Sequence, residues 1–163
     1  MKRIALILSA AVMTVVVISA CQTETEKTYE TRWVGETMEE ILGNVESQFG
    51  GFSQAMMEVN YRYNELYWAG VDENWGYAEY QLDKLLDATL KGFVRRPDRE
   101  ASAAQFVNTS TPRLMETIEN EDGAAFLERF DRYVESCNTC HEMEDVSFMR
   151  VIVPENRTTV ISF

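Results

Sequence analysis

Apolar and small side chains recur at alternating intervals of three and four between residues 49 and 70 of this 163-residue chain. The positions are Phe49, Phe52, Met56, Val59, Tyr63, Leu66 and Gly70. Such steps return a side chain to the same face of an α-helix, whereas a strand would need steps of two. A seam of this kind is stable when another helix covers it. The pattern therefore predicts packed helices and argues against a sheet-based fold.

Two glycine positions divide this region. Residues 34–49 have their own helical spacing of apolar side chains, and Gly50 with Gly51 interrupts or kinks the helix before the seam continues. Gly70 is a suitable C-terminal stop. The sequence therefore predicts helix from residue 34 to Gly70, broken or bent near its middle.

Further start and stop signals follow along the chain. Asp72 is a suitable N-cap for a helix over residues 75–96. Polar and small residues predict mostly loop, with a short turn, over residues 97–110. Thr111, followed by proline, predicts the start of a short helix, and Asp122 opens the last one.

These segments predict an all-α fold, an antiparallel four-helix bundle joined by short links. After Asp145 the character of the sequence changes. Residues 148–153 are β-branched and aliphatic for the most part, and Pro154 ends that run. We therefore expect an extended C-terminal tail beyond the last helix.

The N-terminal residues have the order of an export signal. Lys2 and Arg3 precede an apolar stretch over residues 4–17, and small residues stand directly before Cys21. This arrangement resembles a bacterial lipobox, whose cysteine is acylated and becomes the mature N-terminus; a plain signal peptide or an uncleaved anchor are the alternatives. We expect a lipoprotein signal over residues 1–20, a polar tether over residues 21–32, and the folded domain over residues 33–163.

The charge balance restricts the partners. The chain has 15 basic and 27 acidic residues, for a net charge of −12. A protein this acidic repels nucleic acid, so we expect none, and a protein partner that docks by charge would present a basic patch.

The strongest chemical motif is Cys137-Asn138-Thr139-Cys140-His141, which contains the chain's one histidine. A redox-active disulfide of the thioredoxin kind would follow a strand, and a structural zinc would need about four ligands, so neither fits. The C-x-x-C-H pattern instead predicts one covalently attached haem c, with thioether bonds to Cys137 and Cys140 and with His141 as the proximal iron ligand. The site would lie near the C-terminal end of the last helix.

A haem motif in that place resembles the class II cytochromes, the cytochrome c-prime group. The stretch over residues 64–82, with Ala69-Gly70 followed by Asn74-Trp75, is similar to a group of small exported cytochromes that carry an A-G…N-W motif and end in an apolar segment and a proline. This resemblance covers most of residues 40–163. It implies a four-helix bundle around one haem, with an upstream methionine that corresponds to Met56.

The sixth iron ligand stays open at this stage. Histidine is excluded, since His141 is the only one. Met56 points inward on the seam and is either the distal ligand or a residue that only lines the pocket. The other options are a lysine, an empty site, or another methionine; Met143 is too near His141 to reach the other haem face, which leaves Met38, Met57, Met115 and Met149 as candidates. Trp68 and Trp75 could line the haem pocket, and we expect core aromatics rather than a functional relay. Arg62 either neutralises a propionate or is exposed.

Two main functions follow from this pattern. No nucleophile set, carboxylate pair or phosphate loop is visible, so electron transfer by a membrane-tethered cytochrome on the periplasmic or extracytoplasmic side of a bacterial membrane is favoured. The alternative is a haem protein with an open distal site that binds nitric oxide or carbon monoxide, or detoxifies. A haem-bearing accessory subunit of a larger complex is a third possibility.

Overall fold

The structure, a computed structural model, describes residues 33–158 and residue 161. The predicted signal peptide, Cys21 and the tether up to residue 32 lie outside the described residues. The chain divides into two units between Val45 and Glu46, and each unit is described by itself.

Helix α2 (Met38–Phe49) runs across this division. It begins with a capping box, in which the Thr37 hydroxyl accepts a hydrogen bond from the Glu40 amide at 3.2 Å and the Glu40 carboxylate accepts one from the Thr37 amide at 3.2 Å. The helix therefore begins later than the predicted residue 34. It ends where Gly50 adopts a positive φ of 64°, so the predicted break at the glycine pair is confirmed.

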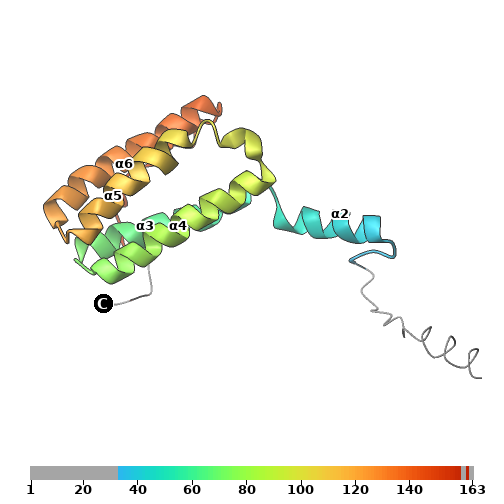
Figure 1. Cartoon of the computed structure of the whole chain (residues 1–163), viewed down its shortest axis with the longest axis horizontal. Coiled ribbons are helices and arrows are strands. Elements are labelled where there is room, and N and C mark those ends of the chain that lie inside the picture. The colour runs from blue at the N-terminus through green and yellow to red at the C-terminus, as the bar shows by residue number, and fades with distance from the viewer. Residues whose placement is uncertain (1–32, 159–160, 162–163) are drawn as a thin grey trace, which may run out of the picture. The chain divides into compact units, whose positions relative to one another are not determined.

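Over residues 50–158, the described part of the second unit after α2, there are four α-helices: α3 (Phe52–Val71), α4 (Trp75–Arg95), α5 (Thr111–Glu119) and α6 (Gly123–Met143). Helix α3 packs along α4, and α5 packs along α6 (Figure 1). Residues 33–158 contain no strand, which confirms the all-α prediction. Within that same range no helix is long and apolar enough to cross a bilayer.

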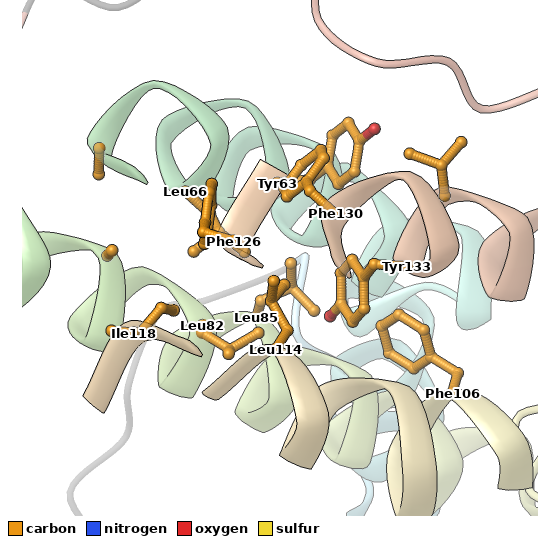
Figure 2. Packing of buried hydrophobic residues seen from close by; sticks show 13 residues of the cluster. Tyr63, Leu66, Leu82, Leu85, Phe106, Leu114, Ile118, Phe126, Phe130 and Tyr133 are labelled. Atoms are coloured by element: carbon orange, nitrogen blue, oxygen red, sulfur yellow. The ribbon is translucent and has the colours of Figure 1, made fainter. Parts of the chain in front are cut away.

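Aromatic side chains of α6 form the centre of the core. Phe130 contacts the ring of Tyr63 in α3, with a centroid distance of 5.1 Å, and Phe126 at 5.6 Å (Figure 2). Phe130 also contacts the ring of Tyr67 in α3, with a centroid distance of 4.9 Å. Buried aliphatic residues of the other helices surround these rings: Leu66, Leu82, Leu85, Leu114 and Ile118. Aromatic rings bury large apolar areas and so dominate the packing energy of a domain of this size.

The link between α3 and α4 differs from the prediction. Asn74, not Asp72, caps α4, because its side chain accepts a hydrogen bond from the Tyr77 amide at 3.3 Å. Asp72 lies at the C-terminal end of α3, and Glu73, with a φ of 55°, turns the chain between them. The Asp72 carboxylate binds Arg157 instead, a partner 85 residues away that a local pattern does not reveal.

Gly70 does not end α3, which continues to Val71. A Cβ atom added at Gly70 would lie 2.1 Å from Cε1 of Phe126, far inside van der Waals contact. Gly70 is therefore required by the close approach of Phe126 of α6. The prediction that this glycine stops the helix was wrong.

Residues 97–110 contain more helix than predicted. A short 3₁₀ helix covers Pro97–Arg99, and the π-helical segment η2 (Phe106–Ser110) runs directly into α5. The Thr111 hydroxyl donates to the Phe106 carbonyl oxygen at 2.9 Å, so it does not cap a helix start. Small polar residues predicted a loop here, but the buried Phe106 ring packs on Tyr133, with a centroid distance of 4.8 Å, and holds the segment helical.

Candidate functional site

A cavity of about 880 Å³ lies within the second unit. Five parts of the chain line it: α3, Thr89 of α4, the segment after α4, the last turns of α6, and the C-terminal tail. The α3 residues include Phe52, Met56, Val59 and Tyr63, which belong to the predicted seam. The first half of that seam therefore faces the cavity, whereas Leu66 is buried in the packed core.

The three predicted haem residues line this cavity together. Cys137, Cys140 and His141 follow one face of α6, as their spacing of three and four requires, and all three are half-buried. Both cysteines are free thiols. The structure thus brings the motif to the wall of a single cavity, together with Met56 of α3.

The thiols are held in their protonated form. Burial, with a further contribution from Cys140, raises the pKa of Cys137 to about 12. Burial also raises the pKa of Cys140, partly opposed by a hydrogen bond from Ser102 and by the charge of Arg99. Cysteines that act in disulfide exchange have a lowered pKa, so this environment disfavours the redox-disulfide alternative.

The imidazole of His141 is oriented by the tail. Its Nδ1 atom lies 2.6 Å from the carbonyl oxygen of Met149. A carbonyl oxygen only accepts hydrogen bonds, so Nδ1 carries the hydrogen and Nε2 of the neutral ring keeps a free lone pair. This is the arrangement by which proteins prepare a histidine for a metal through Nε2.

Asn138, between the two cysteines, holds the tail in place. Its amide nitrogen donates to the Val151 carbonyl oxygen at 2.9 Å, and its amide oxygen accepts from the Val151 amide at 2.8 Å. From α3, the Tyr63 hydroxyl donates to the Ile152 carbonyl oxygen at 2.7 Å. The sequence alone did not reveal this role of Asn138. The side-chain amide both donates to and accepts from Val151, which is 13 residues away in an irregular segment.

The end of the tail is fixed by charge. Arg157 forms a two-pronged ion pair with Asp72, with nitrogen–oxygen distances of 2.5 and 2.7 Å, and its guanidinium lies 4.9 Å from the centroid of the Trp68 ring. The hydrogen bond to Arg157 lowers the pKa of Asp72. Tail residues 149–157 are therefore attached to α6, α3 and the α3–α4 link.

Arginines other than the one considered from the sequence reach the cavity. Arg99 and Arg150 are among its lining residues, and Arg99 forms an ion pair with Glu144, which also accepts a hydrogen bond from Ser102. Arg62 does not line the cavity; its guanidinium donates to the Gln81 side chain at 3.2 Å.

Neither Trp68 nor Trp75 lines the cavity. Trp75 packs edge-on against Phe126, with a centroid distance of 6.0 Å, as expected of a core aromatic. Trp68 lies beneath Arg157 and contacts Tyr67.

The methionine candidates are sorted by position. Met56 is half-buried and lines the cavity; Met57 and Met149 also line it but are 66% and 51% exposed. Met38 in α2 is 70% exposed, and Met115 packs against the core cluster. No lysine is found among the described residues that line the cavity. Met56 is therefore the most enclosed thioether that shares the cavity with His141.

Comparison of the chain with protein-family models, with curated proteins and with solved structures gives no match.

The Asn138–Val151 pair yields a prediction about stability. Asn138→Ala removes two hydrogen bonds, each of which contributes about 0.5–1.5 kcal/mol, so the free energy of unfolding should fall by about 1–3 kcal/mol. The Val151 amide should also exchange its hydrogen faster, as NMR would detect. Asn108→Ala, an exposed asparagine in η2, is the matched control and should change stability by less than about 0.5 kcal/mol. Equal effects of the two substitutions would contradict the role given to Asn138.

Proposed function

We propose that this protein is a membrane-tethered electron carrier with one haem c in the 880 Å³ cavity. The observation that carries the proposal is that both thiols of the C-x-x-C-H motif line one cavity with a histidine whose Nε2 is free because Nδ1 is bonded to the Met149 carbonyl oxygen. The volume falls in the upper part of the usual range for small-molecule sites, about 300–1,000 Å³, which suits a large cofactor. The aromatic and aliphatic side chains of α3 and of the tail suit its apolar faces.

The cofactor, when bound, supplies an iron that alternates between the ferric and ferrous states. The chain would provide the attachment, since the thiols of Cys137 and Cys140 would hold the porphyrin through thioether bonds. His141 would bind the iron as proximal ligand through Nε2, since the Met149 carbonyl oxygen engages Nδ1 and orients the ring. Arg99 and Arg150 line the cavity and could form ion pairs with the haem propionates. Arg99 also forms an ion pair with Glu144, so its guanidinium would bind both carboxylates.

We also propose the antiparallel order predicted from the sequence, with the haem near the C-terminal end of α6. The short connections from α3 to α4, residues 72–74, and from α5 to α6, residues 120–122, favour reversal of direction at each link. This arrangement would agree with the resemblance to class II cytochromes. The net charge of −12 favours a redox partner with a basic docking patch.

Attachment to the membrane is proposed through Cys21. Mass spectrometry of the purified protein should find a mature chain that starts at Cys21 and carries acyl groups. Cys21→Ala should release the protein from the membrane and leave its haem spectrum unchanged, because the cysteine precedes the folded domain by more than ten residues. A mature protein that retains Met1, or an unmodified Cys21, contradicts the lipid anchor.

Covalent attachment of haem is tested on denaturing gels. Wild-type protein should show haem-dependent peroxidase staining at its own mass, whereas Cys137→Ala or Cys140→Ala should weaken the staining because one thioether bond is lost. Ser136→Ala, in the same turn of α6 but outside the cavity, should retain full staining. Haem that extracts from the wild-type protein into acidified organic solvent would overturn the proposal.

Met56 as the distal ligand is tested by the spin state of the iron. A thioether ligand gives low-spin iron with a weak far-red absorption band in the oxidised protein, and Met56→Ala should remove that band and open a site for carbon monoxide. Met115→Ala, at a partly buried side chain that packs on the core cluster, is the packing control. Both substitutions should lower the free energy of unfolding, by no more than the roughly 2–5 kcal/mol that a fully buried methionine contributes, but only Met56→Ala should change the spin state. Low-spin iron that persists in Met56→Ala contradicts ligation by Met56. Wild-type iron that is already high-spin and binds nitric oxide contradicts electron transfer and supports the gas-binding alternative.

A further inference from the structure

A second, smaller cavity of about 210 Å³ lies on a different face of α6. It is enclosed by η2, the start of α5 and the middle of α6, and none of its residues lines the larger cavity. Three arginines line it: Arg113 from α5, and Arg129 and Arg132 from α6.

The gathering of these arginines is unusual for this chain. Acidic residues outnumber basic ones by 27 to 15, yet the charged side chains that line the cavity are three arginines and one glutamate, Glu135. Arginines that share a cavity repel one another, and an anion bound between them offsets this repulsion because each guanidinium is attracted to it. The local charge of about +2 therefore opposes the net charge of the whole protein.

The arginines also have few partners of their own. Arg132 forms an ion pair at 3.6 Å with Glu128, which lies one turn earlier in α6. Both side chains are largely exposed, so this ion pair is weak. Among residues 33–158 the guanidinium groups of Arg113 and Arg129 make no hydrogen bond or ion pair. An arginine carries five donors in a fixed fork that matches the spacing of oxygen atoms on phosphate or carboxylate groups.

Hydroxyl groups complete the lining. Ser110 contributes a neutral donor, whereas the Thr139 hydroxyl also lines the cavity but donates its hydrogen to the Glu135 carbonyl oxygen at 2.9 Å. The volume corresponds to about seven water molecules at roughly 30 Å³ each, and it is below the range of about 300–1,000 Å³ that is usual for larger organic ligands. The cavity thus suits an anion of few heavy atoms with oxygen acceptors on several sides.

We propose that this cavity is a binding site for a small tetrahedral oxyanion of the phosphate class, held by Arg113 and Arg129 and by the Ser110 hydroxyl. The site is separate from the haem site and belongs to the charge pattern of α5 and α6. Since Thr139 is in the C-x-x-C-H motif, the anion and the haem would share one turn of α6.

The test is titration of the purified full-length protein with inorganic phosphate, followed by calorimetry and by phosphorus NMR, at an ionic strength kept constant with sodium chloride. Saturable binding to one site in the millimolar range or tighter is expected. Arg113→Gln and Arg129→Gln should each weaken it about tenfold or more, because each removes charge-assisted hydrogen bonds. Lys91→Gln, which removes the same charge from an exposed position of α4, is the matched control and should leave the affinity unchanged.

Arg113→Lys and Arg129→Lys separate the fork from the charge. They keep the charge and should still weaken phosphate binding, since a lysine offers no fork of donors. Thermal unfolding of each variant checks that the fold is retained. Absence of saturable phosphate binding, or equal affinity in the arginine and Lys91 variants, would overturn the proposal. Equal binding of acetate and phosphate would overturn the preference for tetrahedral anions.

Discussion

The packing of the α6 aromatic residues against α3 determines where the chemical motif lies. Phe126, Phe130 and Tyr133 are buried against side chains that include Tyr63 and Leu66, and this fixes the rotation of α6 about its axis. Cys137 follows Tyr133 by four residues and Phe130 by seven, so it continues the same face one and two turns further along. After Tyr133 this face of α6 no longer packs in the core. It carries Cys137, Cys140 and His141 instead, and these side chains form part of the cavity wall.

The tail completes the cavity through contacts that the helices alone do not provide. Asn138 pairs with both backbone groups of Val151, Tyr63 binds the next carbonyl, and Arg157 closes the segment against Asp72. Irregular backbone near a protein interior needs partners for its amides and carbonyls, and side chains of α3 and α6 supply them here. The Met149 carbonyl reaches His141 because the residues after it are held in this way.

Local patterns in the sequence predicted the parts of the fold that depend on neighbours in the chain. The seam of α3, the break at Gly50 and the cap at Asp122 are of this kind; the Asp122 side chain accepts from the Ala125 amide at 3.0 Å. The motif residues predicted to share a face do share one. Each of these features depends only on residues within about one or two helical turns of each other, so the local sequence was sufficient to predict them.

The features that the sequence did not reveal depend on residues far apart. Asp72 has the composition of a helix cap, but its partner is Arg157, and Gly70 resembles a helix stop although Phe126 explains it. The π-helical turn at Phe106 depends on contact with Tyr133, 27 positions later. Asn138 looks like an arbitrary residue within the motif until the tail is placed beside it.

The division of the α3 seam connects this fold with the proposed cofactor. A regular spacing of three and four from residue 52 to residue 66 predicts one continuous contact with neighbouring helices, yet only Tyr63 and Leu66 belong to the buried core. Phe52, Met56 and Val59 turn their side chains toward the cavity, where the wall opposite is the C-x-x-C-H motif and the tail. A rigid apolar group attached to α6 would cover these side chains as a partner helix covers the rest of the seam. The proposed cofactor would then be part of the hydrophobic core, and its binding would be thermodynamically linked to the folding of the bundle.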